Sequence, residues 1–296
     1  MKNFKLGKIS ILFCIVLTIM IFVGCSKSNL LINNEKDNNN EINITNENLD
    51  EAPFEVTVLN TGKSDCILIE IGDKTIMIDT GTNKNGDQIS KVLKEKNIDT
   101  LEYLILTHMD KDHIGGADSV LNQAKVNNLI QADYVKESKQ YEQYVQVVEE
   151  KNLQPIKLHK NINTEINGAK ISIYPALKKE YAESNDYSII VRITYGEHGF
   201  LFAGDAEEER LAEFLSTNKT HYTFLKLPHH GRYNKLSEEL IKSVEPTYGV
   251  ITCSEDEMAD DKILQLLEKY NVTTFLTLNG DVVVKSDGKN INIVQE

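Results

Sequence analysis

Cysteine is scarce in this chain, which has four in 296 residues. Cys14 lies within an apolar N-terminal stretch and Cys25 lies at its end, so only Cys66 and Cys253 remain in the body of the protein. Each of these two belongs to an apolar, strand-like run, which favours a thiol packed in the core. A disulfide between them would suit an exported protein. Their spacing does not indicate one, so no disulfide framework is expected.

Positive charge is also in short supply. The formal net charge is −13, from 32 basic and 45 acidic residues. Without the three lysines among the first eight residues the balance is 29 basic against 45 acidic residues, or −16. An acidic body is repelled by anionic polymers at long range. This argues against a nonspecific nucleic-acid clamp, although a total charge leaves room for a local basic patch.

The N-terminus has the pattern of an export signal. Lysines at positions 2, 5 and 8 precede the uncharged stretch Ile9 to Gly24, which is rather short for a stable membrane span. Gly24 followed by Cys25 resembles the processing site of bacterial lipoproteins, which implies cleavage before Cys25 and a diacylglyceryl thioether on its sulfur. Phe22 stands where that pattern usually has Leu, and an uncleaved signal anchor is the alternative. Both interpretations put the rest of the chain outside the cytoplasm.

We therefore divide the chain into three parts. Residues 1–24 are interpreted as a lipoprotein signal peptide. Residues 25–53 are rich in Asn, Glu and Asp and have too little apolar surface to offset the entropy cost of ordering. As a flexible coil they would form a tether that holds the following domain roughly 30 Å from its anchor. Residues 54–296 are expected to form one folded domain.

This third part alternates strand-like and helix-like segments, which predicts an α/β sandwich with helices on its outer faces. We find no internal repeat at a short period. Strands are expected at residues 54–59, 66–71, 74–79, 103–106, 170–174, 187–193, 200–203, 222–227, 248–252, 274–277 and 281–285, and helices at 86–96, 115–123, 135–151, 206–215, 237–243 and 260–270.

A dense group of ionisable residues follows the apolar run Tyr103 to Leu106. Four ionisable side chains at one strand end would repel and desolvate one another unless a cation held them. Imidazole nitrogen and carboxylate oxygen are the donors expected around Zn²⁺ or Mn²⁺. The alternative is a charged helix start with incidental histidines. The four residues are His108, Asp110, Asp112 and His113.

Three further polar motifs follow predicted strands in the same way. They are Asp79-Thr80-Gly81, Gly204-Asp205 and His229-His230-Gly231. Loops at one rim of a sandwich can bring such residues together, so the four strand ends predict one pocket.

Together these motifs resemble the metallo-β-lactamase superfamily, and more narrowly the hydrolase domain of the competence protein ComEC and the related phosphorylcholine esterases. The resemblance covers about Phe54 to Val284 and implies a four-layer αββα sandwich with two divalent metal ions, Zn or Mn, at its edge. It is carried by Gly62 and Asp65, Asp79-Thr80-Gly81, His108-x-Asp110-x-Asp112-His113-x-Gly115-Gly116, Asn185-Asp186-Tyr187-Ser188, Gly204-Asp205 and His229-His230-Gly231.

The resemblance also implies roles for these residues. His108 and Asp110 would bind one metal, and Asp112 and His113 the other. Asp205 would bridge both ions. His230 would complete the ligand set of the second ion, with His229 as the fallback. Asp79 would orient a liganding histidine.

The chain departs from the wider superfamily in three places. Asp110 stands where many members have His, and the expected middle histidine is absent from the region of Asn185 to Ser188. Both departures match the ComEC-like branch and imply a more weakly held first metal, with Mn²⁺ a rival to Zn²⁺. Arg232, followed by Tyr233, stands where relatives commonly have Ser. Either of them could contact the substrate, or Arg232 could be a solvent-exposed loop cation.

Three functions compete on these grounds. The leading one is an extracytoplasmic, membrane-anchored hydrolase that cleaves phosphoesters of nucleic acid or of a phosphocholine-bearing wall polymer with a metal-activated hydroxide. Asp112 or Asp205 could take up its proton, although a metal ligand is a poor free base. A β-lactam or lactone hydrolase is disfavoured by the first two departures. A noncatalytic surface-binding lipoprotein is disfavoured because all six ligands are retained. No protein partner is predicted.

Overall fold

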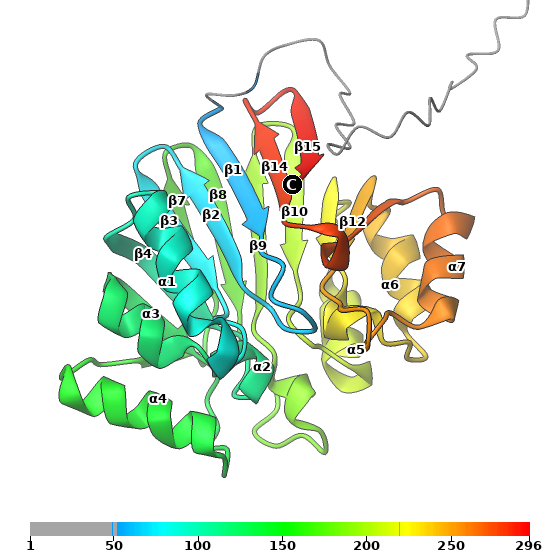
Figure 1. The fold of residues 1–296 in the computed structure, drawn as a ribbon. Coiled ribbons are helices and arrows are strands. Elements are labelled where there is room, and N and C mark those ends of the chain that lie inside the picture. The colour runs from blue at the N-terminus through cyan, green and yellow to red at the C-terminus, as the bar shows by residue number, and fades with distance from the viewer. Residues whose placement is uncertain (1–48, 50–51, 219) are drawn as a thin grey trace, which may run out of the picture. The chain divides into compact units, whose positions relative to one another are not determined.

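The computed structural model describes Leu49 and residues 52–218 and 220–296, and two facing β-sheets make up its centre (Figure 1). The first sheet has the strand order β15-β14-β1-β2-β3-β4-β5-β6. Strands β3 to β6 are parallel and the other neighbours are antiparallel. Its strands are β1 (Phe54–Val58), β2 (Ile67–Ile71), β3 (Lys74–Ile78), β4 (Thr100–Leu106), β5 (Lys125–Gln131), β6 (Ile156–Lys157), β14 (Val282–Ser286) and β15 (Ile291–Gln295).

The second sheet repeats this plan with the order β13-β12-β11-β10-β9-β8-β7. Its first half in sequence, β7 to β10, is antiparallel, and β10 to β13 are parallel. The strands are β7 (Ile162–Ile166), β8 (Ala169–Tyr174), β9 (Ile190–Tyr195), β10 (His198–Phe202), β11 (Phe224–Lys226), β12 (Tyr248–Ile251) and β13 (Thr273–Leu276).

Helices cover the outer face of each sheet, which gives the four-layer αββα order (Figure 1). One side carries α1 (Gly86–Glu95), α3 (Ala117–Gln123) and α4 (Lys139–Glu150), and the other carries α5 (Glu208–Thr217), α6 (Ser237–Val244) and α7 (Asp261–Lys269). Shorter elements are η1 (Asn83–Asn85), α2 (Lys111–Ile114), η2 (Ser184–Tyr187), η3 (Pro228–Gly231) and η4 (Thr277–Asn279). The predicted fold class is thereby confirmed.

Side-chain alternation along the strands separates two apolar cores. In β10, Phe200 and Phe202 face the layer between the sheets, whereas Leu201 packs beneath the helices of the second sheet. Phe200 lies 4.7 Å from Phe54 of the first sheet, measured between ring centroids. In β11, Phe224 shares this inner layer, so Lys226, two residues later, points toward the first sheet as well. A charged side chain thus ends an otherwise apolar inner layer.

Most predicted elements are present, with shifts at their ends. The helix expected at 115–123 begins two residues later, as α3, and the Gly115-Gly116 pair separates it from the short helix α2, which was not predicted. The strand expected at 187–193 begins three residues later, since residues up to Tyr187 form the short helix η2. Strands β5, β6, β7 and β15 were not predicted.

The two body cysteines, Cys66 and Cys253, are buried and free, as predicted for packed thiols. Among the described residues, no helix is both long and apolar enough to span a membrane. The predicted signal peptide, the predicted lipid-attachment site Cys25 and nearly all of the predicted tether lie outside the described residues.

Candidate metal centre

The predicted site residues lie where the parallel strands of both sheets end. Strand β4 leads to His108, and α2 follows at once with Asp112 and His113. Strands β10 and β11 of the other sheet lead to Asp205 and His230. Three backbone hydrogen bonds fasten α2 to neighbouring loops: Asp65 N donates to Asp112 O (3.1 Å), Thr80 N to His113 O (2.6 Å) and Gly115 N to Gly81 O (2.9 Å).

Four of the predicted ligands converge on one point. The donor atoms of Asp112, His113, Asp205 and His230 all lie within 4.8 Å of one another. Asp205 Oδ2 is 3.2 Å from His113 Nε2 and 3.2 Å from His230 Nε2. His230 Nε2 is also 3.5 Å from Asp112 Oδ2. The structure thus brings together every residue that was assigned to the second metal, together with the carboxylate expected to bridge.

The protonation pattern of His230 follows from its neighbour Thr252. The Thr252 hydroxyl donates its one hydrogen to Asp65 Oδ1 at 2.7 Å, because an ionised carboxylate only accepts. The 2.8 Å contact between Thr252 Oγ1 and His230 Nδ1 must therefore be a hydrogen bond donated by Nδ1–H. When the ring is neutral, as a metal ligand must be, its Nε2 is unprotonated and faces Asp112 and Asp205.

The same logic applies to the two histidines from the first sheet. Asp79 accepts hydrogen bonds from Thr107 N (2.8 Å), from Thr107 Oγ1 (2.7 Å) and from His113 Nδ1 (2.8 Å). Because the Thr107 hydroxyl hydrogen goes to Asp79, His108 Nδ1–H is the donor in its 3.1 Å contact with Thr107 Oγ1. Asp79 therefore orients His113 directly and His108 through Thr107, which is a common arrangement around liganding histidines.

These contacts leave several buried acceptors facing one another. Within the described part of the chain, the Nε2 atoms of His108, His113 and His230 and Oδ1 of Asp205 find no hydrogen-bond partner. Buried polar atoms of native proteins are seldom left in this state. Nitrogen and oxygen lone pairs that converge in a buried place fit a divalent cation such as Zn²⁺ or Mn²⁺. The residues present therefore fit the metal that this set of donors implies.

The pKa values of the site reflect burial and mutual contact. Burial, with His113 nearby, lowers the pKa of His108 to about 3, so its ring is neutral, as a metal ligand must be. Burial alone would lower the pKa of His113 and raise that of Asp205, but each stabilises the charged form of the other. The result is a raised pKa for His113 and a lowered one for Asp205. In the metal-free protein protons thus balance the carboxylates, and a bound cation would displace them.

A buried lysine lies beneath the cluster. Lys226 is fully buried, donates a hydrogen bond to Asp65 and lies 4.0 Å from Asp205 Oδ1. Burial alone would raise the pKa of Asp65, but Lys226, His230 and His113 lower it. This ion pair gives the buried carboxylate of Asp65 a cationic partner from the other sheet.

The backbone around the site is strained in ways that its packing enforces. Asp79, His229 and His230 adopt the left-handed region, with φ of 57°, 48° and 51°. Each such non-glycine residue costs on the order of 1–3 kcal/mol, which the surrounding contacts must offset. Gly204 is also left-handed, and a Cβ there would lie 3.0 Å from Ser188 Oγ and from Thr107 Cβ. Only glycine lets Asp205 approach the cluster at this point.

Comparison with known proteins identifies the family. Residues 59–254 match the Metallo-beta-lactamase superfamily. The chain belongs to this superfamily. It is 27% identical over 190 residues to ComE operon protein 3 of Bacillus subtilis (strain 168), covering 62% of this chain and 24% of that protein. It is 26% identical over 209 residues to Recombination protein 2 of Haemophilus influenzae, covering 69% of this chain and 25% of that protein.

The chain thus spans about a quarter of the length of these curated relatives. Among solved structures, the metallo-beta-lactamase fold protein YhfI from Bacillus subtilis aligns with a TM-score of 0.52 at 15% identity, covering 76% of this chain and 96% of that chain. The resemblance to the ComEC-like branch of the metallo-β-lactamase superfamily is confirmed, and the chain has the metal-dependent hydrolase fold of this superfamily.

The other residues predicted from the superfamily lie around the cluster. Asp110 is not one of the four converging residues, because its carboxylate accepts hydrogen bonds from Lys136 and from Ser184 Oγ (3.2 Å). Met109 N donates to Tyr134 OH (2.7 Å), which brings this ring beside Asp110. His108 and Asp110 thus present a less complete set for a first metal than the one formed around Asp205.

His229 and Arg232 point away from the cluster. His229 Nδ1 lies 2.8 Å from Glu207 Oε1, which places this ring outside the converging group and makes His230 the superfamily histidine that faces it. Arg232 is 44% exposed and pairs with Asp260 at 3.1 Å, as expected of a loop cation. Asn185 occupies the region of the missing histidine and donates to Glu207 Oε1 at 3.0 Å.

Sequence reasoning missed the residues that hold the ligands. Lys226, Thr252 and Thr107 were not singled out, although each touches a residue of the cluster or its carboxylate partners. One signal was available for Lys226, since a lysine inside the apolar run 224–227 is unusual for a buried strand. The two threonines carry no such signal, because threonine is common in and after strands.

Proposed function

We propose that this protein is an extracytoplasmic, metal-dependent phosphodiesterase. The observation that carries the proposal is the position of Asp205 Oδ2, 3.2 Å from both His113 Nε2 and His230 Nε2, beside a third bare nitrogen on His108. Two divalent ions held there, Zn or Mn, would lower the pKa of a shared water and clamp the attacking and leaving oxygens of a phosphoryl group. The names of two relatives, a recombination protein and a competence protein, fit a substrate in nucleic acid.

Each residue has a defined task in this proposal. Asp112, His113 and His230 would hold one ion, His108 and Asp110 the other, and Asp205 both. Asp79 and Thr252 keep the histidine protons on Nδ1 so that the Nε2 lone pairs stay available. Asp112, which is 20% exposed, and the buried Asp205 are the proposed proton acceptors at the cluster.

The test of this proposal is hydrolysis of bis-p-nitrophenyl phosphate by protein loaded with Mn²⁺ or Zn²⁺. Asp205→Asn should lower kcat/KM by about 100-fold or more while the fold, followed by circular dichroism, is kept. Asp133→Asn is the matched control, because Asp133 is a half-exposed carboxylate that pairs with His159 away from the cluster. Full activity of metal-loaded Asp205→Asn would overturn the bridging role. Turnover of nitrocefin in place of the phosphodiester would favour a β-lactam hydrolase, and metal binding without any turnover would favour a binding protein.

We also propose that the protein is attached to the outer face of the cell membrane by a lipid on Cys25. The sequence pattern and the competence-protein relatives support this location. Cys25→Ser should move the protein from the membrane fraction to the soluble extracytoplasmic fraction. Unchanged membrane attachment would favour an uncleaved signal anchor.

A further inference from the structure

A lysine-lined cleft of about 430 Å³ opens beside the metal cluster. Its lining includes Lys63, Lys84 and Lys111, together with Asp112 and Glu257. The cleft therefore shares one residue, Asp112, with the group of four converging donors. Three cations in one cleft are notable in a chain whose formal net charge is −13.

The cleft lies on the open side of the cluster. His113, Asp205 and His230 are buried, whereas the side chain of Asp112 is 20% exposed and its Oδ2 lies 3.5 Å from His230 Nε2. Of the four converging residues, Asp112 alone is accessible, and it faces the lysines. A phosphoryl group bound at the cluster beside Asp112 would therefore lie next to this cleft.

The backbone that carries two of the lysines is packed against the cluster. Lys84 belongs to η1, and Lys111 is the first residue of α2. Gly115 packs α2 so closely against η1 that a Cβ on it would lie 2.5 Å from Asn83 N. In addition, Asn83 Nδ2 donates to Gln143 Oε1 of α4 at 2.8 Å. The two ammonium groups therefore extend from backbone segments that are anchored to the same helix as Asp112.

These lysines are also available to an anion. Lys84 and Lys111 are exposed and form no ion pair or hydrogen bond with any residue that the structure describes. Lys63 pairs with Glu257 at 3.7 Å, and Glu257 is 56% exposed, so this pair is weak and screened by solvent.

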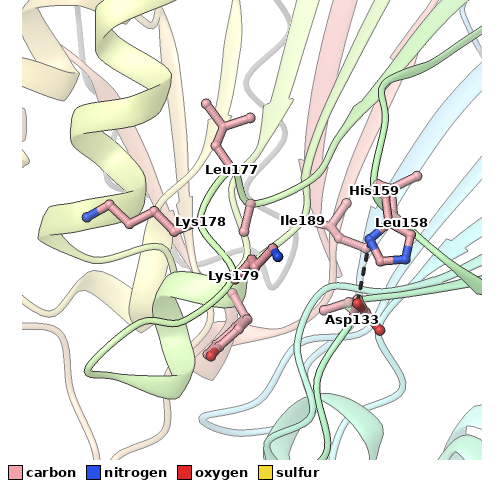
Figure 2. A pocket seen from close by; sticks show the side chains of 10 residues that line it. Asp133, Leu158, His159, Leu177, Lys178, Lys179 and Ile189 are labelled. Carbon is pink, nitrogen blue, oxygen red and sulfur yellow. Dashed lines mark ion pairs between the residues drawn. The ribbon is translucent and has the colours of Figure 1, made fainter.

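A second cavity, of about 330 Å³, offers a useful contrast (Figure 2). It also contains two lysines, Lys178 and Lys179, but Figure 2 shows Lys178 extending away from the pair formed by Asp133 and His159. Lys178 is bound by Glu209, and Asp133 adds a negative charge to the lining. None of the four converging donors lines this cavity. Its position away from the cluster, and the pairing of Lys178 with Glu209, make it a poor site for a phosphate next to the one being cleaved.

We propose that the cleft of Lys63, Lys84 and Lys111 binds a phosphate next to the one being cleaved, so that the substrate is a chain of phosphodiesters. This inference rests on the proposed phosphodiesterase function and narrows its substrate. Among the described residues that line the cleft there is no aromatic side chain on which a base could stack. The cleft recognises the repeated phosphates of the polymer and not its side groups.

Binding of a fluorescein-labelled 12-nucleotide oligothymidylate, followed by anisotropy in EDTA, separates recognition from cleavage. In Lys84→Gln/Lys111→Gln the dissociation constant should rise about tenfold. The slope of log affinity against log salt should fall by about 0.7 to 1 per lysine. A glycerol phosphate oligomer with the same number of phosphates should compete with the oligonucleotide. The matched control, Lys178→Gln/Lys179→Gln, should bind like the wild type.

Three results would overturn the inference: no binding by the wild type, equal losses in the test and control variants, or no competition by the glycerol phosphate oligomer. Turnover of bis-p-nitrophenyl phosphate by the wild type is measured separately, because it tests the proposed function and not the cleft. If the wild type fails to hydrolyse this compound with either metal, the proposed function fails, while the anisotropy result still judges the cleft by itself.

Discussion

Replacing Lys226 by methionine should lower the free energy of unfolding by about 3–5 kcal/mol, the usual cost of removing one partner from a buried ion pair. Methionine nearly matches the volume of the lysine side chain, so little of the loss comes from packing. The loss arises because Asp65 stays buried without its lysine partner, with the Thr252 hydroxyl as a hydrogen-bond donor and with His230 and His113 at 3.5 and 4.0 Å. Lys226 also lies 4.0 Å from Asp205 Oδ1, and two unit charges at that distance attract by about 4 kcal/mol at an effective dielectric constant near 20. A loss of this size is a large part of the roughly 5–15 kcal/mol by which domains are stable.

Urea unfolding in EDTA, followed by circular dichroism, measures this effect without a contribution from bound metal. Lys235→Met is the matched control, because Lys235 is 83% exposed and pairs with Glu208 at 3.0 Å. It should unfold like the wild type. The double variant Lys226→Met/Asp65→Leu should recover much of the loss, since it leaves no unpaired charge. A loss below about 1 kcal/mol in Lys226→Met would refute the reasoning, because Asp65 would then have no need of its partner.

Three further predictions follow from the contacts around the site and the first sheet. Thr252→Val removes the acceptor of His230 Nδ1 and should weaken metal binding by about 10–100-fold in titration calorimetry, whereas Thr274→Val should not change it. Lys136→Met releases the carboxylate of Asp110 and should raise the amount of metal retained after gel filtration, measured by elemental analysis. An unchanged metal-to-protein ratio would contradict a competition between Lys136 and the metal for this carboxylate. Glu55→Gln should destabilise the protein at pH 7, because burial raises the pKa of Glu55 but Lys96 lowers it below the ordinary 4.5, so its stabilisation is present above that pH and is lost as pH falls. Urea unfolding should show a smaller difference in the free energy of unfolding between the wild type and Glu55→Gln at pH 3 than at pH 7.

The main parts of the fold and the residues of the cluster could be predicted because they depend on residues that are close together in the sequence. Four ionisable side chains within six residues, directly after an apolar strand, need a cation wherever the strand lies. Buried strands such as β2 and β3 consist largely of branched apolar residues. Strand β7 was missed because it is an edge strand with the sequence Ile-Asn-Thr-Glu-Ile and only partial burial. Strand β5 was missed because only its second half is buried.

The support of the cluster could not be predicted because it depends on contacts between distant segments. Lys226 and Asp65 are 161 residues apart, and Thr252 is 187 residues from Asp65. Neither the proton positions on the histidines nor the contact of Asp110 with Lys136 follows from spacing, since both depend on which loops meet at the rim. The motif thus fixes which residues are present, while the packing of two sheets fixes which atoms are free to bind.

The three main-chain hydrogen bonds that fasten α2 to its neighbouring loops bear on how the protein takes up and exchanges its ions. They join Asp65, Thr80 and Gly81 to α2 or to the glycine after it, without using any side chain that would coordinate metal. The amides of Asp65, Thr80 and Gly115 should therefore exchange with deuterium equally slowly in EDTA and in the loaded protein. An ion that enters such a preassembled rim does not have to order the chain. The occupancy of the metal site would therefore depend on the metal concentration and the pH of the surroundings and not on refolding.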